Sequence, residues 1–147
     1  MAEFTLRMAS ESDSAVIRKL VHDARINPMN LDWRRFLIAE SPEGKVAGIG
    51  QIKLHGTDLL ELASIVVEPE YRGLGVARLI INHLLETHPK PVYLMCRSQL
   101  ESFYKKFGFR VLAVDEMPDY FRRLAMFART FSFIQRKDNS LLIMMME

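Results

Sequence analysis

The pattern of apolar and polar positions predicts a buried strand, a tight turn and a helix in the middle of the chain. Leu59–Val67 is mostly apolar and becomes β-branched towards its end, as in a strand covered on both faces. Glu68-Pro69-Glu70 interrupts this run, and two glycines follow in Arg72-Gly73-Leu74-Gly75. From Val76 the apolar residues recur with helical spacing, and His88-Pro89 ends the pattern.

The flanking segments carry similar patterns. Before the central strand–turn–helix unit, the pattern predicts a strand at Phe4–Met8, a helix from Ser10 or Ser12 to about Arg25, and an antiparallel hairpin of Arg35–Glu40 and Lys45–His55. After the central unit, it predicts a strand at Pro91–Cys96, a short helix at Leu100–Phe107, a strand at Phe109–Val114, a helix at Tyr120–Phe131, a polar turn at Gln135–Ser140 and a strand at Leu141–Met146.

This order of elements predicts one α/β domain of the mixed α+β kind over residues 1–147. Three hairpin-linked strands precede the central strand–helix unit, which favours a mixed sheet of about six to seven strands with helices on both faces. Gly48 and Gly50 weaken the second hairpin strand and predict a bulge or a close approach of another element.

The turn before the central helix has the composition of an anion site. The first N–H groups of a helix lack partners inside it, and the helix dipole favours negative charge there. Glycines let a phosphate approach the main chain, and Arg72 adds a fork of donors that suits phosphate. We therefore expect a pyrophosphate cradle at Arg72–Arg78.

The spacing within this turn narrows the choice of ligand. No Lys-Ser/Thr pair follows Gly75, which argues against a P-loop, and Arg78 stands where a dinucleotide fingerprint needs Gly or Ala. Arg72-x-x-Gly75-x-Ala77 resembles the Gln/Arg-x-x-Gly-x-Gly/Ala acyl-CoA-binding motif of the GNAT superfamily of N-acetyltransferases. The alternative is an ordinary strand–turn–helix corner whose glycines serve packing.

A second stretch strengthens the resemblance. Phe103-Tyr104-x-x-x-Gly108-Phe109 is similar to a signature in the second half of GNAT domains, where the Tyr commonly sits near the thioester sulfur. The resemblance implies that Tyr104 donates its proton to the departing CoA thiolate, since a phenol of pKa about 10 is protonated at neutral pH. The alternative is a partly buried aromatic residue. Ser98 lies near the place of an Asn in many relatives and is the candidate for that contact.

A GNAT-like fold implies direct acetyl transfer from acetyl-CoA to a primary amine in a ternary complex, without a metal. The pantetheine arm would pair with main-chain groups of the central strand, and the diphosphate would lie on amides of the turn. The cofactor-binding residues expected from the resemblance are Ile65, Val66, Val67, Arg72, Gly73, Leu74, Gly75, Val76, Ala77, Arg78, Ser98 and Tyr104.

The amine needs a base, because an ammonium has no lone pair. Glu61 is the first candidate, since it is the one charge in an apolar strand and is costly there unless it has a use or a partner. The alternatives are exposure to solvent or pairing with an Arg. His55 is a further candidate, although a lone His in a strand is more often structural. Trp33 lies where GNAT acceptors bind, but its alternative is a core residue.

Composition bounds the remaining possibilities. The net charge of +2 and the lack of a basic run argue against a nucleic-acid partner, and no long apolar run predicts a membrane span. The single cysteine, Cys96, fits a cytoplasmic location, and a small buried residue is favoured over an acyl carrier there. The Tyr120–Phe131 helix would form either a homodimer surface or a cap on the sheet.

Two functions follow from these residues. The first is an N-acetyltransferase acting on a small-molecule or protein amine. The second is a non-catalytic acyl-CoA-binding or sensing domain, which would keep the cradle but lack a working base.

Overall fold

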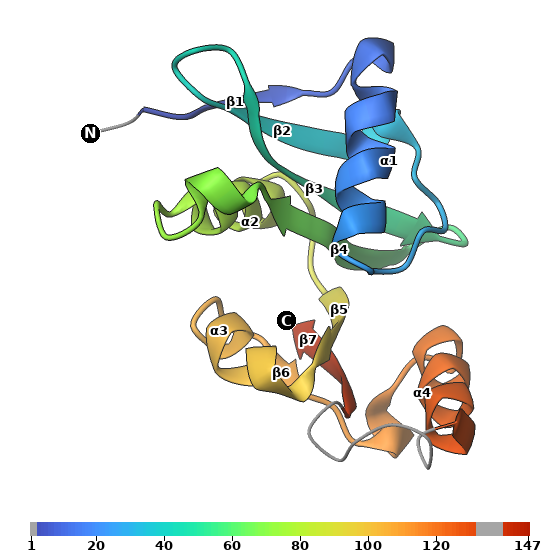
Figure 1. The fold of residues 1–147 in the computed structure, drawn as a ribbon. Coiled ribbons are helices and arrows are strands. Elements are labelled where there is room, and N and C mark those ends of the chain that lie inside the picture. The colour runs from blue at the N-terminus through green and yellow to red at the C-terminus, as the bar shows by residue number, and fades with distance from the viewer. Residues whose placement is uncertain (1–2, 132–139) are drawn as a thin grey trace. The chain divides into compact units, whose positions relative to one another are not determined.

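The computed structural model describes residues 3–131 and 140–147, and the chain divides into two compact units, Met1–Pro89 and Lys90–Glu147. The described residues form seven strands and four α-helices, so the predicted mixed α/β class is confirmed (Figure 1). Of the polar turn predicted at Gln135–Ser140, all but Ser140 lies outside the described residues.

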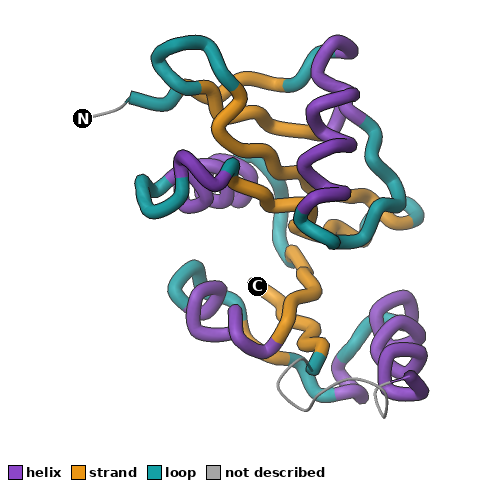
Figure 2. The backbone as a smooth tube through the Cα atoms, in the orientation of Figure 1, coloured by secondary structure: helices purple, strands orange, loops and turns teal. Residues whose placement is uncertain are grey.

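The first unit is built on four strands that pair antiparallel in chain order. They are β1 (Thr5–Met8), β2 (Phe36–Glu40), β3 (Val46–His55) and β4 (Leu59–Val67). Figure 2 shows them in orange, lying side by side. The predicted hairpin is confirmed, and β4 has the predicted bounds because Pro69 ends the apolar run.

Two helices, α1 (Ser14–Asp23) and α2 (Val76–Glu86), cover opposite faces of this sheet (Figure 1). On the α1 face, Ile17, Leu20 and Val21 form a buried cluster with residues of β2, β3 and β4. The helix predicted from Ser10 or Ser12 begins later than expected, because a 3-10 turn at Glu11–Asp13 precedes it.

The α2 face is where the glycines of β3 matter. A Cβ at Gly48 would lie 2.9 Å from Val76 Cγ1, and one at Gly50 would lie 2.6 Å from Ile80 Cγ2. No side chain fits at these distances, so the glycines allow α2 to approach the sheet. The close approach predicted for them is confirmed.

A bulge interrupts β4 beside Gly50. Ile49 pairs with Val66 and Gln51 pairs with Ala63, so Ser64 and Ile65 together stand opposite one residue of β3. Ser64 has φ of 58°, a left-handed conformation that is uncommon for a residue with a side chain. The irregularity predicted near Gly50 is therefore confirmed, with its extra residue in β4.

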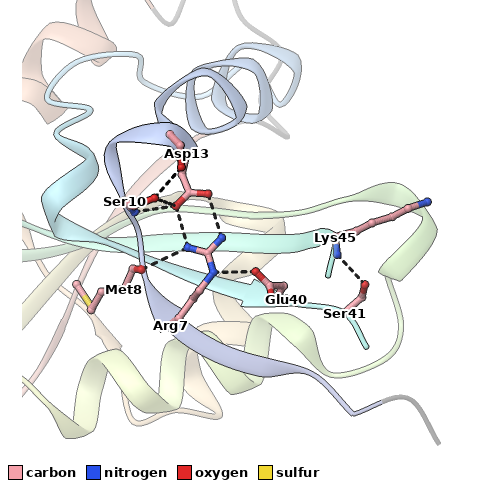
Figure 3. A network of polar contacts seen from close by, with 8 residues as sticks. Arg7, Met8, Ser10, Asp13, Glu40, Ser41 and Lys45 are labelled. Atoms are coloured by element: carbon pink, nitrogen blue, oxygen red, sulfur yellow. Dashed lines mark hydrogen bonds and ion pairs between the residues drawn. The ribbon is translucent and has the colours of Figure 1, made fainter. Parts of the chain in front are cut away.

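Ion pairs link β1 to β2 and to the turn before α1 in the first unit (Figure 3). The Arg7 guanidinium on β1 donates two hydrogen bonds to the Asp13 carboxylate, at 2.8 and 3.0 Å, and a third from Nε to Glu40 on β2, at 2.7 Å. Asp13 also accepts a hydrogen bond from the Ser10 backbone at 2.7 Å. We call Arg7, Asp13 and Glu40 the amino-terminal ion cluster; it ties two strands to the start of α1.

The second unit contains β5 (Val92–Arg97), β6 (Arg110–Val111) and β7 (Leu141–Met146), with β7 paired antiparallel to both others. This central place explains the burial of Ile143 and Met144 in a strand near the chain end. The strand predicted at Phe109–Val114 is wrong beyond Val111. Leu112 and Ala113 have no regular structure, and a 3-10 turn follows at Val114–Glu116, where the Glu116 carboxylate accepts a hydrogen bond from the Ala113 amide at 3.0 Å.

The two helices of this unit are α3 (Glu101–Lys105) and α4 (Asp119–Phe131). Phe121 on α4 is fully buried and stacks on Tyr93 of β5, with ring centroids 5.4 Å apart. The helix therefore caps its own sheet through Phe121, whereas Phe127 on the same helix is 65% exposed.

Candidate functional site

The turn between β4 and α2 combines left-handed glycines with open space. After a 3-10 turn at Pro69–Tyr71, Gly73 has φ of 79° and Gly75 has φ of 83°. A Cβ at either glycine would meet no atom within 4 Å, so their role is conformational and they leave the main chain uncovered. Gly75 is the N-terminal cap residue of α2.

The amides of this turn are open. Within the described part of the chain, no hydrogen bond is donated by the backbone N–H groups of residues 73–78, and the first bond at the helix start runs from Leu79 to the Gly75 carbonyl at 3.1 Å. Such amides at a helix N-terminus attract anions. The exposed Arg72 donates from Nε to the Val67 carbonyl at 3.3 Å, which ties the turn to the end of β4.

The segment expected to hold the pantetheine arm lies just beyond the bulge. Val66 is buried on the α1 face, and Ile65 reaches the α2 face, where its Cδ1 would lie 2.7 Å from a Cβ at Gly50. Val67 pairs with Gly48. The bulge at Ser64 therefore sets the directions in which these three residues point.

Glu61 is buried on β4 and contacts a histidine. It is 3% exposed, and its Oε1 lies 2.7 Å from Nε2 of His55. Neither alternative considered for Glu61, exposure to solvent or pairing with an Arg, is present. The two candidate bases therefore form one pair, in which His55 orients the carboxylate.

Lys53 stands directly opposite Glu61 in the β3–β4 pair and is also 3% exposed. Its burial lowers the pKa of the ammonium, against the nearby charge of Glu61. No hydrogen bond or ion pair of this ammonium occurs among the described residues. We call Lys53, His55 and Glu61 the strand-face cluster.

Lys53 was not among the functional residues predicted from the sequence. Its signal was the alternation of Gln51, Lys53 and His55, three polar residues on one face of a strand whose neighbour carries Glu61. Alternating polar residues usually mark a solvated face, but Ile49 on the same face belongs to the α1 core. That shared face identifies the polar residues as buried ones.

Polar contacts continue along this face towards the loop after α1. Gln51 Nε2 donates to Ser64 Oγ at 2.9 Å and to the Asn30 carbonyl at 3.3 Å. Gln51 Oε1 is the one fully buried side-chain polar atom without a partner in the described part of the chain. Leu31 and Trp33 pack against the α1 core, which supports the core interpretation of Trp33.

In the second unit, the Phe103–Phe109 stretch folds into an aromatic cluster. The Tyr104 ring meets those of Phe103 and Phe109 edge-on, with centroids 5.0 and 6.1 Å away, and Gly108 ends the turn with φ of 104°. Burial, with a smaller contribution from Cys96, raises the pKa of Tyr104 to about 12. The phenol is therefore protonated at neutral pH, as a proton donor must be.

Ser98 and Cys96 lie at the end of β5 in this unit. The Ser98 amide donates to the Ser140 carbonyl at 2.9 Å. The Cys96 thiol is buried 3.8 Å from Met144 Sδ, and burial raises its pKa to about 11. A protonated thiol is a poor nucleophile, so the geometry favours the structural interpretation of Cys96.

Two further findings concern the described residues alone. They contain no group of three or more His, Cys, Asp or Glu side chains placed to hold a metal ion. None of their helices has the length and apolar character that crossing a membrane requires.

The Acetyltransferase (GNAT) domain model matches residues 32–111, which is more than half of the chain. The protein therefore belongs to the GNAT family of acetyltransferases. The comparison with curated proteins finds no match.

Solved structures share the fold across both units. Rv2747 from Mycobacterium tuberculosis, solved with CoA, is 22% identical with a TM-score of 0.72, over 97% of this chain and 98% of that one. Escherichia coli ElaA is 19% identical with a TM-score of 0.67, over 100% of each chain. N-acetylglutamate synthase from Neisseria gonorrhoeae, solved with coenzyme A and N-acetyl-glutamate, is 17% identical with a TM-score of 0.73, over 100% of this chain and 36% of that one. At these identities the likeness establishes the fold alone.

Proposed function

We propose that residues 1–147 form a single N-acetyltransferase domain, which transfers the acetyl group of acetyl-CoA to a primary amine by direct attack in a ternary complex. The observation that carries the proposal is the row of unbonded amides at residues 73–78, placed at the start of α2 directly after a bulged strand. Membership of the GNAT family and the CoA complexes of similar structures support it.

In this proposal the first unit holds the cofactor. The diphosphate accepts hydrogen bonds from amides of residues 73–78, with Arg72 beside it, while the pantetheine arm follows Ile65, Val66 and Val67. An amide of Val66 or Val67 stabilises the charge that develops on the thioester oxygen, a contribution of about 3–4 kcal/mol where such donors have been removed. Ser98 is retained as a proposed contact of the pantetheine arm.

Glu61 removes the proton from the acceptor amine, directly or through water. Its buried carboxylate is held by His55 at 2.7 Å, so the base is fixed before the amine arrives. His55 keeps more contact with solvent than Glu61, with side-chain exposures of 10% and 4%. We propose that the proton then leaves towards solvent through the histidine.

Tyr104 serves the departing thiolate. Its pKa of about 12 lies well above the ordinary value for a thiol, about 8.5, so complete proton transfer to the thiolate is unfavourable. A hydrogen bond from the phenol stabilises the negative sulfur as it leaves, and water supplies the final proton. We therefore propose Tyr104 as a hydrogen-bond donor to the leaving sulfur, in place of the full proton donor that the resemblance implies.

The cradle is tested with two matched glycine substitutions. Gly75 and Gly44 have φ of 83° and 82°, and a Cβ at either meets no atom within 4 Å. Each change to Ala should therefore cost about 1–2 kcal/mol of stability through backbone strain. We expect Gly75→Ala alone to weaken acetyl-CoA binding, at least tenfold by calorimetry. Equal binding by both variants would contradict the proposal.

Turnover is tested by thiol release with acetyl-CoA and a panel of amines. Tyr104→Phe keeps the aromatic contacts but removes the donor, so we expect normal acetyl-CoA binding and a kcat lowered by about 10–100-fold. If the wild-type chain binds acetyl-CoA and acetylates no amine, the protein is a non-catalytic acyl-CoA-binding domain instead.

A further inference from the structure

Lys53 and Glu61 place two opposite charges side by side on the α1 face of the first unit. Because they are directly paired in antiparallel strands, their Cα atoms lie about 4.5–5.5 Å apart and their side chains share one face. Each residue is 3% exposed. The two charges nevertheless form no ion pair, since the contact of the Glu61 carboxylate is with His55.

The Lys53 ammonium therefore lacks a counter-ion in contact. Removing such a group from water without pairing it is unfavourable by several kcal/mol. Gln51 Oε1 is the one fully buried side-chain polar atom without a partner in the part of the chain that the structure describes. The Lys53 nitrogen has no hydrogen bond there and is not among the fully buried atoms, so it keeps some contact with solvent.

We propose that Lys53 binds the carboxylate of the acceptor, and that the acceptors of this protein are amino acids with a free α-carboxylate. This inference rests on the proposed function, with Glu61 as the base. An α-amino acid carries its amine and its carboxylate on one carbon. The paired Glu61 and Lys53 present the complementary groups side by side, a carboxylate for the amine and an ammonium for the carboxylate. The amine is directed to Glu61 because its carboxylate is held by Lys53.

The same charge disfavours other amines. A polyamine or a lysine side chain would bring a second cation towards Lys53 without a carboxylate to neutralise it. An amino acid amide matches the shape of its parent acid but lacks the anion. Comparison of an acid with its amide therefore isolates the contribution of the carboxylate.

The test uses the full chain, acetyl-CoA and matched pairs of L-amino acids and their amides in the thiol-release assay. We expect the wild-type kcat/KM for the acids to exceed that for the amides at least tenfold, mainly through KM. Lys53→Met, which replaces the ammonium by an apolar group of similar length, should bring the ratio of acid to amide kcat/KM down to about one. Lys53→Arg retains the charge and should retain the preference. Lys45→Met, at an exposed site beside β3, is the control and should change neither rate.

Several results would overturn the inference. The first is equal rates for acids and amides in the wild type. The second is a loss of activity towards both acids and amides in Lys53→Met while acetyl-CoA binding stays normal. The third is a preference for acids over amides that survives in Lys53→Met. If Lys53→Met unfolds, as thermal denaturation would show, the wild-type comparison and Lys53→Arg still decide the matter.

A binding measurement separates this inference from the proposed function. Equilibrium dialysis of N-acetyl amino acids in the presence of CoA tests the carboxylate site without turnover. If the protein acetylates no amine but binds N-acetyl amino acids, and Lys53→Met weakens that binding, the carboxylate site is supported and the proposed enzyme activity is rejected. Acetylation of amines without any carboxylate preference would support the enzyme and reject the site. Neither binding nor turnover would reject both.

Discussion

The first unit contains two groups of charged side chains that differ in how completely they are paired. In the amino-terminal ion cluster, Arg7 contacts both carboxylates, at 2.7 and 2.8 Å, and Asp13 is also held by the Ser10 backbone. In the strand-face cluster, Glu61 and Lys53 are as buried as Asp13 or more so, but among the described residues the close ion contact of this cluster is between Glu61 and His55.

This difference suggests different uses. A buried carboxylate that is fully bonded is stabilised by the fold, and its hydrogen bonds hold the elements together. A buried lysine without a contact partner weakens the fold unless something else bonds to it. Burial alone therefore does not separate a structural cluster from a functional one; the completeness of pairing does.

The largest expected effect is on catalysis and comes from Glu61. Glu61→Gln keeps the shape and a hydrogen bond to His55 but removes the base, so we expect kcat/KM to fall by about 10²–10⁴-fold. Asp13→Asn makes the same chemical change in the amino-terminal ion cluster and should leave the rate of folded enzyme unaltered. Steady-state thiol release, normalised to the folded fraction measured by circular dichroism, checks both.

Acetyl-CoA binding by Glu61→Gln should equal that of the wild type, because Glu61 lies away from the turn at residues 73–78. An Asp13→Asn variant that loses activity as severely as Glu61→Gln would remove the distinction between the clusters. A Glu61→Gln variant with wild-type turnover would show that another group accepts the proton.

Local patterns in the sequence predicted the elements that carry the proposed cofactor site. The bounds of β4 and β7 follow from apolar runs that end at clear breakers, and the start of α2 follows from the glycines before Val76. Gly48 and Gly50 predicted the close approach of another element, because glycine weakens a strand and usually has a packing reason there.

Features that depend on pairing between distant segments could not be predicted in this way. Lys53 is significant because antiparallel register sets it opposite Glu61, and no pattern within β3 reveals that. Ser64 carries no signal for the left-handed conformation it adopts in the bulge. The strand predicted at Phe109–Val114 forms only over Arg110–Val111, and a 3-10 turn begins at Val114, where the Glu116 side chain bonds the Ala113 amide.

An intermediate effect is expected from Asp13 on the free energy of unfolding, and this effect depends on pH. The hydrogen bonds from Arg7 lower the pKa of Asp13 to about 2, so folding favours the ionised form. The resulting stabilisation is present above the unfolded pKa of about 3.9 and is lost as the pH falls through about 2. Allowing for the partial exposure of Arg7, we expect Asp13→Asn to cost about 1–2 kcal/mol at pH 7.

Urea unfolding of the wild type and Asp13→Asn at pH 7, 5, 4, 3 and 2 measures this contribution. The difference in free energy of unfolding should be constant down to about pH 5 and should shrink steadily towards pH 2. A difference that does not change with pH would mean that Asp13 stabilises the fold without its charge.

The smallest effect is expected from an ion pair that is as short as those of the amino-terminal ion cluster but fully exposed. Lys19 and Asp23 lie one turn apart on α1, with Nζ 2.7 Å from Oδ2 and side chains 72% and 54% exposed. Water screens the two charges, and both side chains lose rotational freedom when they pair. Lys19→Gln, which preserves helix propensity, should shift Tm by no more than about 1 °C.

Arg7→Gln is the matched comparison and should lower Tm by several degrees, because it leaves the Asp13 carboxylate buried without its partner. Differential scanning calorimetry of both variants at low and high salt completes the test. If Lys19→Gln lowered Tm as much as Arg7→Gln, distance alone would determine the strength of these pairs. If only Arg7→Gln does so, the shielding of the carboxylate from water is what gives a short ion pair its effect, and the same shielding around Lys53 makes its missing partner significant.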